Sequence, residues 1–249
     1  MMSKRRNIQK NWFTMLEVIL IGTVFALLIS GVILAINRTF IFLNNTRVQI
    51  RATNLTREGM EMMFNIRDTN RRKYSWEKDK YWLYIGSWDI GNINYFFTEW
   101  IYTIKEWKNG NWDKFVYAEK LNGTDMITFY EDLDSFFSET NSDYINSREK
   151  SKLIFIWTYN YWSWSAASGS MFTWNISDIL WNGVEFYRVA RVYGIYEKNS
   201  NDSNSPVNGI SALQNSDPKE IRFCVKTFYK MGVWLHSTEL CSIMTNFMG

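Results

Sequence analysis

The sequence predicts an α+β protein in which one long N-terminal helix precedes a mainly antiparallel β-sheet. Two observations carry this prediction. An apolar run covers residues 13–36, and a stripe of apolar residues at helical spacing continues to about residue 68. From about Tyr81 the pattern changes to short runs rich in aromatic and β-branched residues, with turn signals such as "KNGN" at 108–111. Helical and strand patterns that are segregated along a chain are typical of the α+β class.

Composition argues against several functional classes. The 249 residues carry a net charge of only +3, whereas nucleic-acid binding needs a larger, clustered basic surplus. One histidine, His236, and two cysteines are too few for a typical zinc site. A Ser-His-Asp site would depend on His236, but no nucleophile elbow and no Gly-rich phosphate loop are present. We therefore expect a non-catalytic protein with no metal, no cofactor and no nucleic-acid partner.

The apolar run at 13–36 predicts a membrane-spanning helix. As a helix it would be about 36 Å long, enough to cross a hydrocarbon core of about 30 Å. Basic residues and no acid precede it, and this pattern favours an N-terminus in the cytoplasm with the rest of the chain outside. The basic residues are Lys4, Arg5, Arg6 and Lys10. We expect a single-pass protein of the cytoplasmic (inner) membrane.

Glu17 separates three interpretations of this segment. A secretory signal peptide has a shorter apolar core and small residues at its cleavage site, and "ILAINRTF" at 33–40 matches that pattern poorly. A plain membrane anchor explains everything except Glu17, because a carboxylate near the membrane interior is costly without a partner. The third interpretation supplies that partner.

The residues "WFTMLEV" at 12–18 resemble the prepilin processing motif of type IV pilins and pseudopilins. The resemblance covers residues 4 to about 36. It implies that a prepilin peptidase cuts between Trp12 and Phe13, and that the new amine on Phe13 is methylated. It also implies that Glu17 meets the amine of a neighbouring subunit during filament assembly. Phe13 and Glu17 would lie one helical turn apart on one face, which fits that role.

Trp12 departs from the family, which has glycine before the cut. Some bacterial lineages read the codon UGA as glycine and others as tryptophan, so we consider that several tryptophans are miscalled glycines. Neighbouring Asn, Ser or Asp residues, typical of turns that favour glycine, point to a set of eight. They are Trp12, Trp76, Trp88, Trp112, Trp162, Trp164, Trp174 and Trp181, and Trp234 sits at a predicted hairpin tip. The alternative is a genuinely Trp-rich surface that binds sugars or proteins.

Four regions follow from these patterns. We expect a basic leader at 1–12, a transmembrane or filament-core helix at 13–36, an amphipathic continuation at 37–68 and an exoplasmic β-rich head at 69–249. Predicted strands cover 81–85, 98–107, 114–121, 126–133, 152–161, 184–196, 220–230 and 238–247. The polar stretch 197–220 holds both prolines and is predicted to be a long surface loop.

The two cysteines are spaced for a cross-strand disulfide. A hairpin that turns at Gly232 and Val233 places Cys224 opposite Cys241. Disulfides persist outside the cytoplasm, where the head is expected to lie. Buried free thiols are the alternative.

An acidic cluster precedes the middle of the head. It consists of Glu131, Asp132, Asp134, Glu139 and Asp143. Its spacing matches no calcium loop, so a solvated acidic loop is the preferred interpretation over a calcium site.

Together these features favour a minor pilin or pseudopilin of a type IV pilus, type II secretion or DNA-uptake filament. Its expected partners are prepilin peptidase, other pilin or pseudopilin subunits and the inner membrane. The alternative is a membrane-anchored exoplasmic binding module or adhesin with an aromatic-rich head. A membrane-anchored exoplasmic enzyme has little support, since there is no paired-carboxylate signature.

Overall fold

The computed structural model describes residues 4–74, 81–85, 96–108, 114–121, 123, 126–138, 140–153, 184–198, 204–206 and 218–246. The chain divides into two compact units, Met1–Val48 and Gln49–Gly249. The second unit contains the sheet and is the head of the α+β fold.

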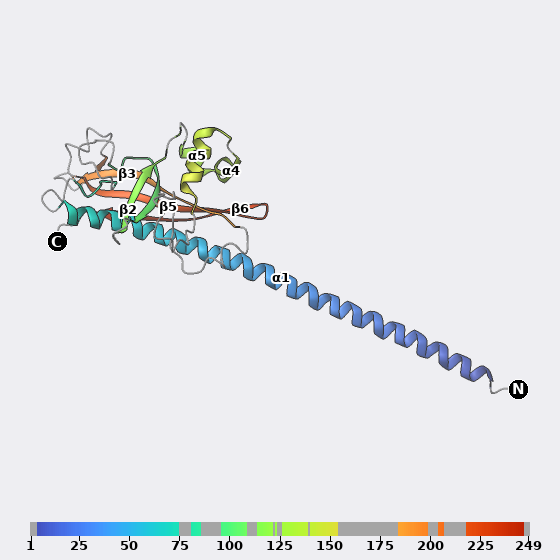
Figure 1. The fold of residues 1–249 in the computed structure, drawn as a ribbon. Coiled ribbons are helices and arrows are strands. Elements are labelled where there is room, and N and C mark those ends of the chain that lie inside the picture. The colour runs from blue at the N-terminus through green and yellow to red at the C-terminus, as the bar shows by residue number, and fades with distance from the viewer. Residues whose placement is uncertain are drawn as a thin grey trace. The chain divides into compact units, whose positions relative to one another are not determined.

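A single helix, α1 (Lys4–Lys73), begins in the first unit and continues into the second (Figure 1). The predicted helix over 13–68 is confirmed and extends five residues further, to Lys73. Neither proline lies within this range, so nothing interrupts the backbone hydrogen bonds. The last turn carries three cations, Arg71, Arg72 and Lys73, which favour the negative end of the helix dipole.

Within the described residues, six strands form one antiparallel sheet in the order β2-β1-β3-β5-β6, and β4 pairs with β3 (Figure 1). The strands are β1 (Ile101–Lys108), β2 (Lys114–Lys120), β3 (Phe186–Lys198), β4 (Asn204–Pro206), β5 (Pro218–Met231) and β6 (Trp234–Thr245). The predictions at 98–107, 114–121, 184–196, 220–230 and 238–247 are confirmed as β1, β2, β3, β5 and β6. The β5–β6 turn falls at Gly232 and Val233 as predicted, and Gly232 adopts a positive φ of 64°.

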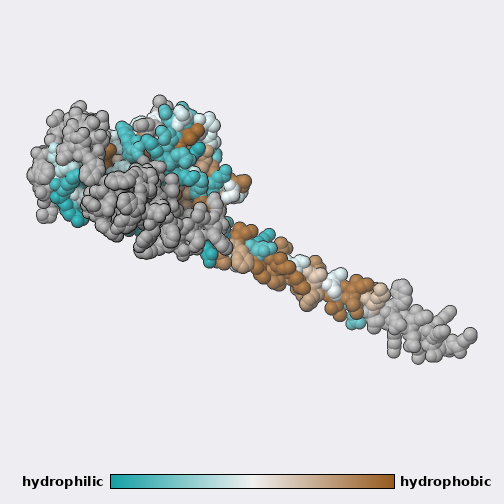
Figure 2. Space-filling view, in the orientation of Figure 1, coloured by the Kyte–Doolittle hydropathy of each residue, from teal (hydrophilic) through white to brown (hydrophobic). Residues whose placement is uncertain are grey.

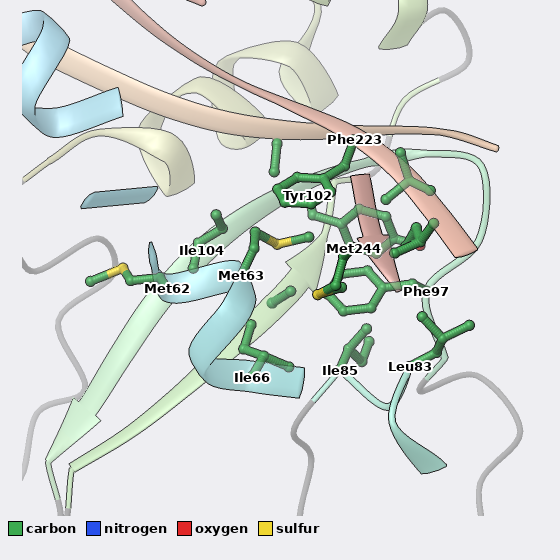
Figure 3. Close-up of a cluster of buried hydrophobic side chains, with 14 of the residues drawn as sticks. Met62, Met63, Ile66, Leu83, Ile85, Phe97, Tyr102, Ile104, Phe223 and Met244 are labelled. Atoms are coloured by element: carbon green, nitrogen blue, oxygen red, sulfur yellow. The ribbon is translucent and has the colours of Figure 1, made fainter. Parts of the chain in front are cut away.

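The two faces of the sheet pack against different helices. On one face the head portion of α1 contributes Met62, Met63 and Ile66 to a core that includes Phe223 and Val225 (Figure 3). On the other face, α3 (Met126–Glu131) and α4 (Leu133–Ser138) cover β3 and β5, and Phe136 stacks on Phe228 with ring centroids 4.0 Å apart. A third short helix, α5 (Ser142–Ser151), follows. The apolar stripe predicted along α1 is therefore the face that binds the sheet.

The strand predicted at 126–133 is wrong, because these residues form α3 and the start of α4. The buried side chains Met126, Phe129 and Tyr130 recur at i, i+3 and i+4, the spacing of one helix face. The short aromatic run resembled a strand in composition, but its period is helical.

Three other predicted segments differ from the structure or lie partly outside the described residues. Residues 81–85 form no strand; only Tyr84 makes an isolated bridge, to Phe96. Of the run 152–161, Lys152 bridges to Tyr187 and residues 154–161 lie outside the described residues. The predicted loop at 197–220 contains β4, and β5 begins within it at Pro218.

Candidate membrane and assembly segment

The first unit exposes an apolar surface on all sides of α1. Between Met15 and Leu43, exposed large apolar side chains include Leu27 at 73% and Phe42 at 68% relative exposure. Figure 2 shows this surface as brown atoms along the described part of the helix. Among the described residues, α1 is the one helix long and apolar enough to cross a membrane. A helix that is apolar all round needs lipid or protein around it.

Hydroxyl groups in this segment are satisfied inside the helix. Thr23 Oγ1 donates to the Leu20 carbonyl at 2.8 Å, and Ser30 Oγ donates to the Ala26 carbonyl at 2.8 Å. These bonds let both residues enter an apolar phase without unpaired donors. The exposed carboxylate of Glu17 differs, because it has no hydrogen bond or ion pair within the described part of the chain. In apolar surroundings it would need a cationic partner from outside.

The residues of the resembled cleavage motif lie in α1. Trp12 and Phe13 are helical, and their side chains are outside the described residues. Helix geometry places Glu17 about 6 Å along the axis from Phe13, on the same face. The structure thus places Glu17 one turn beyond Phe13, as the sequence predicted.

The apolar surface at 40–43 is not among the features predicted from the sequence. Phe40, Ile41, Phe42 and Leu43 are each between 47% and 68% exposed, although they follow Arg38 and fall in the segment expected to be amphipathic. The letters "FIFL" were a sufficient signal, since four consecutive large apolar residues cannot all face one core. The exposed apolar segment therefore extends from Met15 to Leu43.

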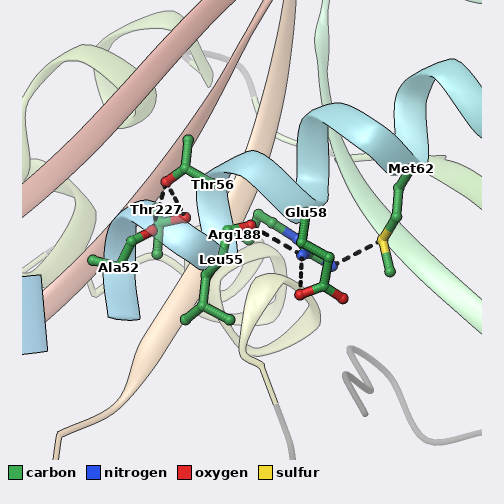
Figure 4. Close-up of polar contacts among 7 residues, drawn as sticks. All are labelled: Ala52, Leu55, Thr56, Glu58, Met62, Arg188 and Thr227. Carbon is green, nitrogen blue, oxygen red and sulfur yellow. Dashed lines mark hydrogen bonds and ion pairs between the residues drawn. The ribbon is translucent and has the colours of Figure 1, made fainter. Parts of the chain in front are cut away.

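A polar seam joins the head portion of α1 to the sheet (Figure 4). Arg188 on β3 is only 1% exposed, and its Nη1 donates to the Leu55 carbonyl at 3.2 Å. The same nitrogen lies 3.7 Å from the carboxylate of Glu58. The hydroxyl oxygens of Thr56 and Thr227 are 2.8 Å apart. These contacts fix the register of the helix on the sheet, because a shift would leave a buried guanidinium without its partners.

Cys224 and Cys241 are directly opposed on β5 and β6 and form a disulfide. Their pairing follows from the hairpin register that the glycine turn sets. The cysteines also lie near Glu239, and among the described residues this trio is the one group close enough to share a metal ion. The disulfide occupies both sulfur atoms, so this arrangement is a covalent link between strands.

The acidic cluster serves the local helices. The Asp132 carboxylate accepts hydrogen bonds from the backbone N–H groups of Asp134 and Ser135, both at 3.1 Å, at the start of α4. Hydrogen bonds from Ser135 and the Asp134 amide hold the pKa of Asp132 below its usual value. Glu131 pairs with Arg191, and Glu139 lies outside the described residues. The four described acids are exposed, as predicted for a solvated cluster, but they lie in and between α3, α4 and α5 and not in a loop.

Two tryptophans in the head are structural. Trp82 is fully buried and its Nε1–H donates to the Pro218 carbonyl at 3.0 Å. Trp100 donates to the Leu121 carbonyl at 2.7 Å. Neither belongs to the set of eight proposed to be glycine, of which seven lie wholly outside the described residues. Those seven are Trp76, Trp88, Trp112, Trp162, Trp164, Trp174 and Trp181.

Trp234 is the first residue of β6, paired with Met231. The positive φ of the turn belongs to Gly232, so the turn does not require glycine at position 234.

No protein-family model, curated protein or solved structure matches this chain. Its fold and its apolar segment define an α+β protein with one N-terminal helix capable of spanning a membrane.

Proposed function

We propose that this chain is a pilin-like filament subunit, either a minor pilin or a pseudopilin. One observation supports it most directly: the Glu17 carboxylate has no partner among the described residues and lies on an exposed apolar helix, one turn after Phe13 and just after a basic leader. A membrane anchor has no use for this carboxylate. A filament subunit that docks by pairing this carboxylate with an amine requires it.

Assembly would proceed in four steps. The apolar segment inserts into the inner membrane with the leader in the cytoplasm. Prepilin peptidase then cuts before Phe13, and the new amine is methylated. Glu17 pairs with the amine of a neighbouring subunit as the helix leaves the lipid. Apolar packing between helices supplies most of the cohesion, and the ion pair selects the register, because an uncompensated buried charge costs about 3–5 kcal/mol.

The second candidate is a membrane-anchored binding module or adhesin. It is favoured by the aromatic content of the chain, 18% Phe, Trp and Tyr. In that case the leader stays attached and Glu17 has no binding role. The two candidates therefore differ at the first 17 residues, and tests at these positions separate them.

The decisive test is Glu17→Gln, which keeps the shape of the side chain and removes its charge. In cells that express the filament, the variant should remain in the membrane and be depleted from sheared filaments. Ser30→Ala is the matched control, because Ser30 bonds only to its own helix and its loss should leave incorporation unchanged. Equal incorporation of wild type and Glu17→Gln would refute the proposal.

Peptide mass spectrometry of the native protein tests processing. The filament subunit should begin at a methylated Phe13. A chain that retains its leader would support the anchored module instead. The same spectra report glycine or tryptophan at each of the eight suspect positions.

Orientation is tested by the disulfide. Basic residues flank the apolar segment on both sides, with Arg47 and Arg51 after it, so charge bias alone does not fix which end is inside. A head outside the cytoplasm should carry oxidised Cys224 and Cys241 in cells alkylated before lysis. Reduced thiols in such cells would place the head inside and exclude an external filament.

A further inference from the structure

The tip of the β5–β6 hairpin, Gly232–Trp234, is an exposed apolar projection (Figure 1). Val233 is 83% and Trp234 71% exposed, the two highest values among large apolar side chains described in the second unit. The disulfide holds β5 and β6 together behind the tip. A rigid hairpin that presents Val and Trp to the surroundings has no role in packing the head, so its apolar tip is available for an external contact.

Two contacts show which way the hairpin points within the head. Thr56 Oγ1 lies 3.3 Å from the Thr238 carbonyl oxygen, and Arg67 Nη1 lies 3.5 Å from that of Thr245. Helix α1 and strand β6 therefore run in the same direction where they contact each other. The start of β6, with the tip before it, lies toward the Gln49 end of the unit.

The lengths of the two elements place the tip more closely. Val233 precedes Thr238 on a strand that rises about 3.3 Å per residue, so it lies roughly 17 Å from the Thr56 contact. Gln49 precedes Thr56 on a helix that rises about 1.5 Å per residue, roughly 10 Å away. The tip thus lies at the Gln49 end of the second unit.

The charges at this end are positive. Residues 227–238 include no acid, and Lys230 is exposed beside the tip. In α1, Arg51 and Arg57 precede the first acid of the unit, Glu58. Cations flanking an exposed tryptophan match a membrane interface with anionic headgroups, where tryptophan is favoured. A second copy of this end would meet it with like charge.

We propose that the hairpin tip inserts into the headgroup layer of the membrane that holds the apolar segment. Val233 and the Trp234 ring enter the acyl boundary, while Lys230 faces anionic headgroups. The tip is then a second, shallow contact that positions the head on the membrane before assembly. This inference rests on the membrane anchoring in the proposed function and not on cleavage or on the Glu17 pair.

The test uses the full chain in vesicles of phosphatidylcholine and phosphatidylglycerol, with an environment-sensitive fluorophore on a single introduced cysteine. Three positions are compared: Val233→Cys at the tip, Leu28→Cys in the apolar segment and Thr69→Cys, exposed at the opposite end of the head. Brominated lipids should quench the probes at Leu28 and Val233 and leave the Thr69 probe unchanged. Adding Trp234→Asp should abolish quenching at Val233 while quenching at Leu28 persists.

The other outcomes overturn the inference in distinguishable ways. Quenching at Leu28 alone would remove the tip contact and leave the anchoring intact. Quenching at neither Leu28 nor Val233 would refute both the tip contact and the membrane anchoring. Equal quenching at Thr69 and Val233 would show that the head touches lipid without using the tip. A glycine mass at position 234 in the native protein would also overturn the inference.

Discussion

Gly59 lies where α1 packs closely against Arg188 and Val225 of the sheet, and replacing it tests the seam directly. A Cβ at this position would lie 2.7 Å from Arg188 Cδ and 2.7 Å from Val225 Cγ1. Ordinary carbon contacts are about 3.5–4.0 Å, so both atoms would have to move by most of an ångström. Neither can move freely, because Val225 is fully buried and Arg188 is held by its hydrogen bonds to α1.

Two opposing effects decide the outcome of Gly59→Ala. Alanine favours the helix over glycine by about 0.8–1.0 kcal/mol. Overpacking a core costs about 1–3 kcal/mol. The expected net result is a loss of about 1 kcal/mol, which corresponds to a fall in melting temperature of about 2–4 °C for a head of this size. Gly59→Leu should cost more, since it places further atoms in the same space.

The assay is thermal unfolding of the full chain in detergent, followed by near-ultraviolet circular dichroism. Asn54→Ala is the matched control, because Asn54 is exposed on the same helix and its replacement changes only helix propensity. It should raise the melting temperature slightly. Val225→Ala should partly relieve the clash, so that Gly59→Ala costs less in that background. If Gly59→Ala stabilises the protein as much as Asn54→Ala does, α1 does not rest on the sheet at Gly59.

Three further predictions concern the head. Removing the disulfide, either with Cys224→Ala and Cys241→Ala or by reduction, should lower the free energy of unfolding by about 3 kcal/mol, because the cysteines are separated by 17 residues. The melting temperature should fall by about 6–12 °C. Identical melting of the oxidised and reduced protein would contradict this prediction. Burial, with a hydrogen bond to Glu239, raises the pKa of the Tyr130 phenol above its usual 10.0. The contribution of the neutral phenol to the free energy of unfolding is therefore fully present below pH 10 and is lost as the pH rises above 10. Tyr130→Phe should therefore reduce the alkaline slope of the unfolding free energy by about 1.4 kcal/mol per pH unit, and an unchanged slope would argue against a buried phenol. Asp132→Ala should lower the melting temperature equally with and without calcium, whereas Asp132→Asn should retain most of the cap; a calcium-dependent loss would favour a metal site.

The β5–β6 hairpin could be predicted from the sequence because several local signals agree. Gly232 supplies the positive φ, the flanking runs are rich in β formers, and the cysteines are equally spaced around the turn. Once the turn is placed, the pairing register of β5 and β6 is fixed, since each residue of β5 then has one partner in β6. The long helix was predictable for a similar reason, because no proline interrupts it and its apolar spacing persists to Ile66.

The helices α3 and α4 and the buried Arg188 were not predicted, for two different reasons. In the helices, aromatic composition suggested a strand while the spacing of Phe129, Leu133 and Phe136 was helical, and the spacing was decisive. Arg188 carried no such signal. An arginine within a strand is usually exposed, and only the approach of α1 at Gly59 covers it and supplies the Leu55 carbonyl and Glu58. A buried charge that depends on a distant element cannot be recognised from its neighbours in sequence.

The same helix must satisfy two different surroundings, and this gives Glu17 its significance. From Ala52 to Ile66, α1 buries its apolar face on the sheet and leaves charged residues such as Arg57 and Glu61 exposed, as a soluble helix does. From Met15 to Leu43 most of its exposed side chains are large and apolar. Lipid and packed helices would both cover that surface equally well. Apolar contact alone therefore does not favour moving the helix from lipid into a bundle of helices. In the filament subunit that we propose, Glu17 would provide the difference, because lipid offers its carboxylate no cation and the amine of a neighbouring subunit would. Replacing Glu17 with glutamine should then remove the preference for assembly while leaving membrane insertion intact.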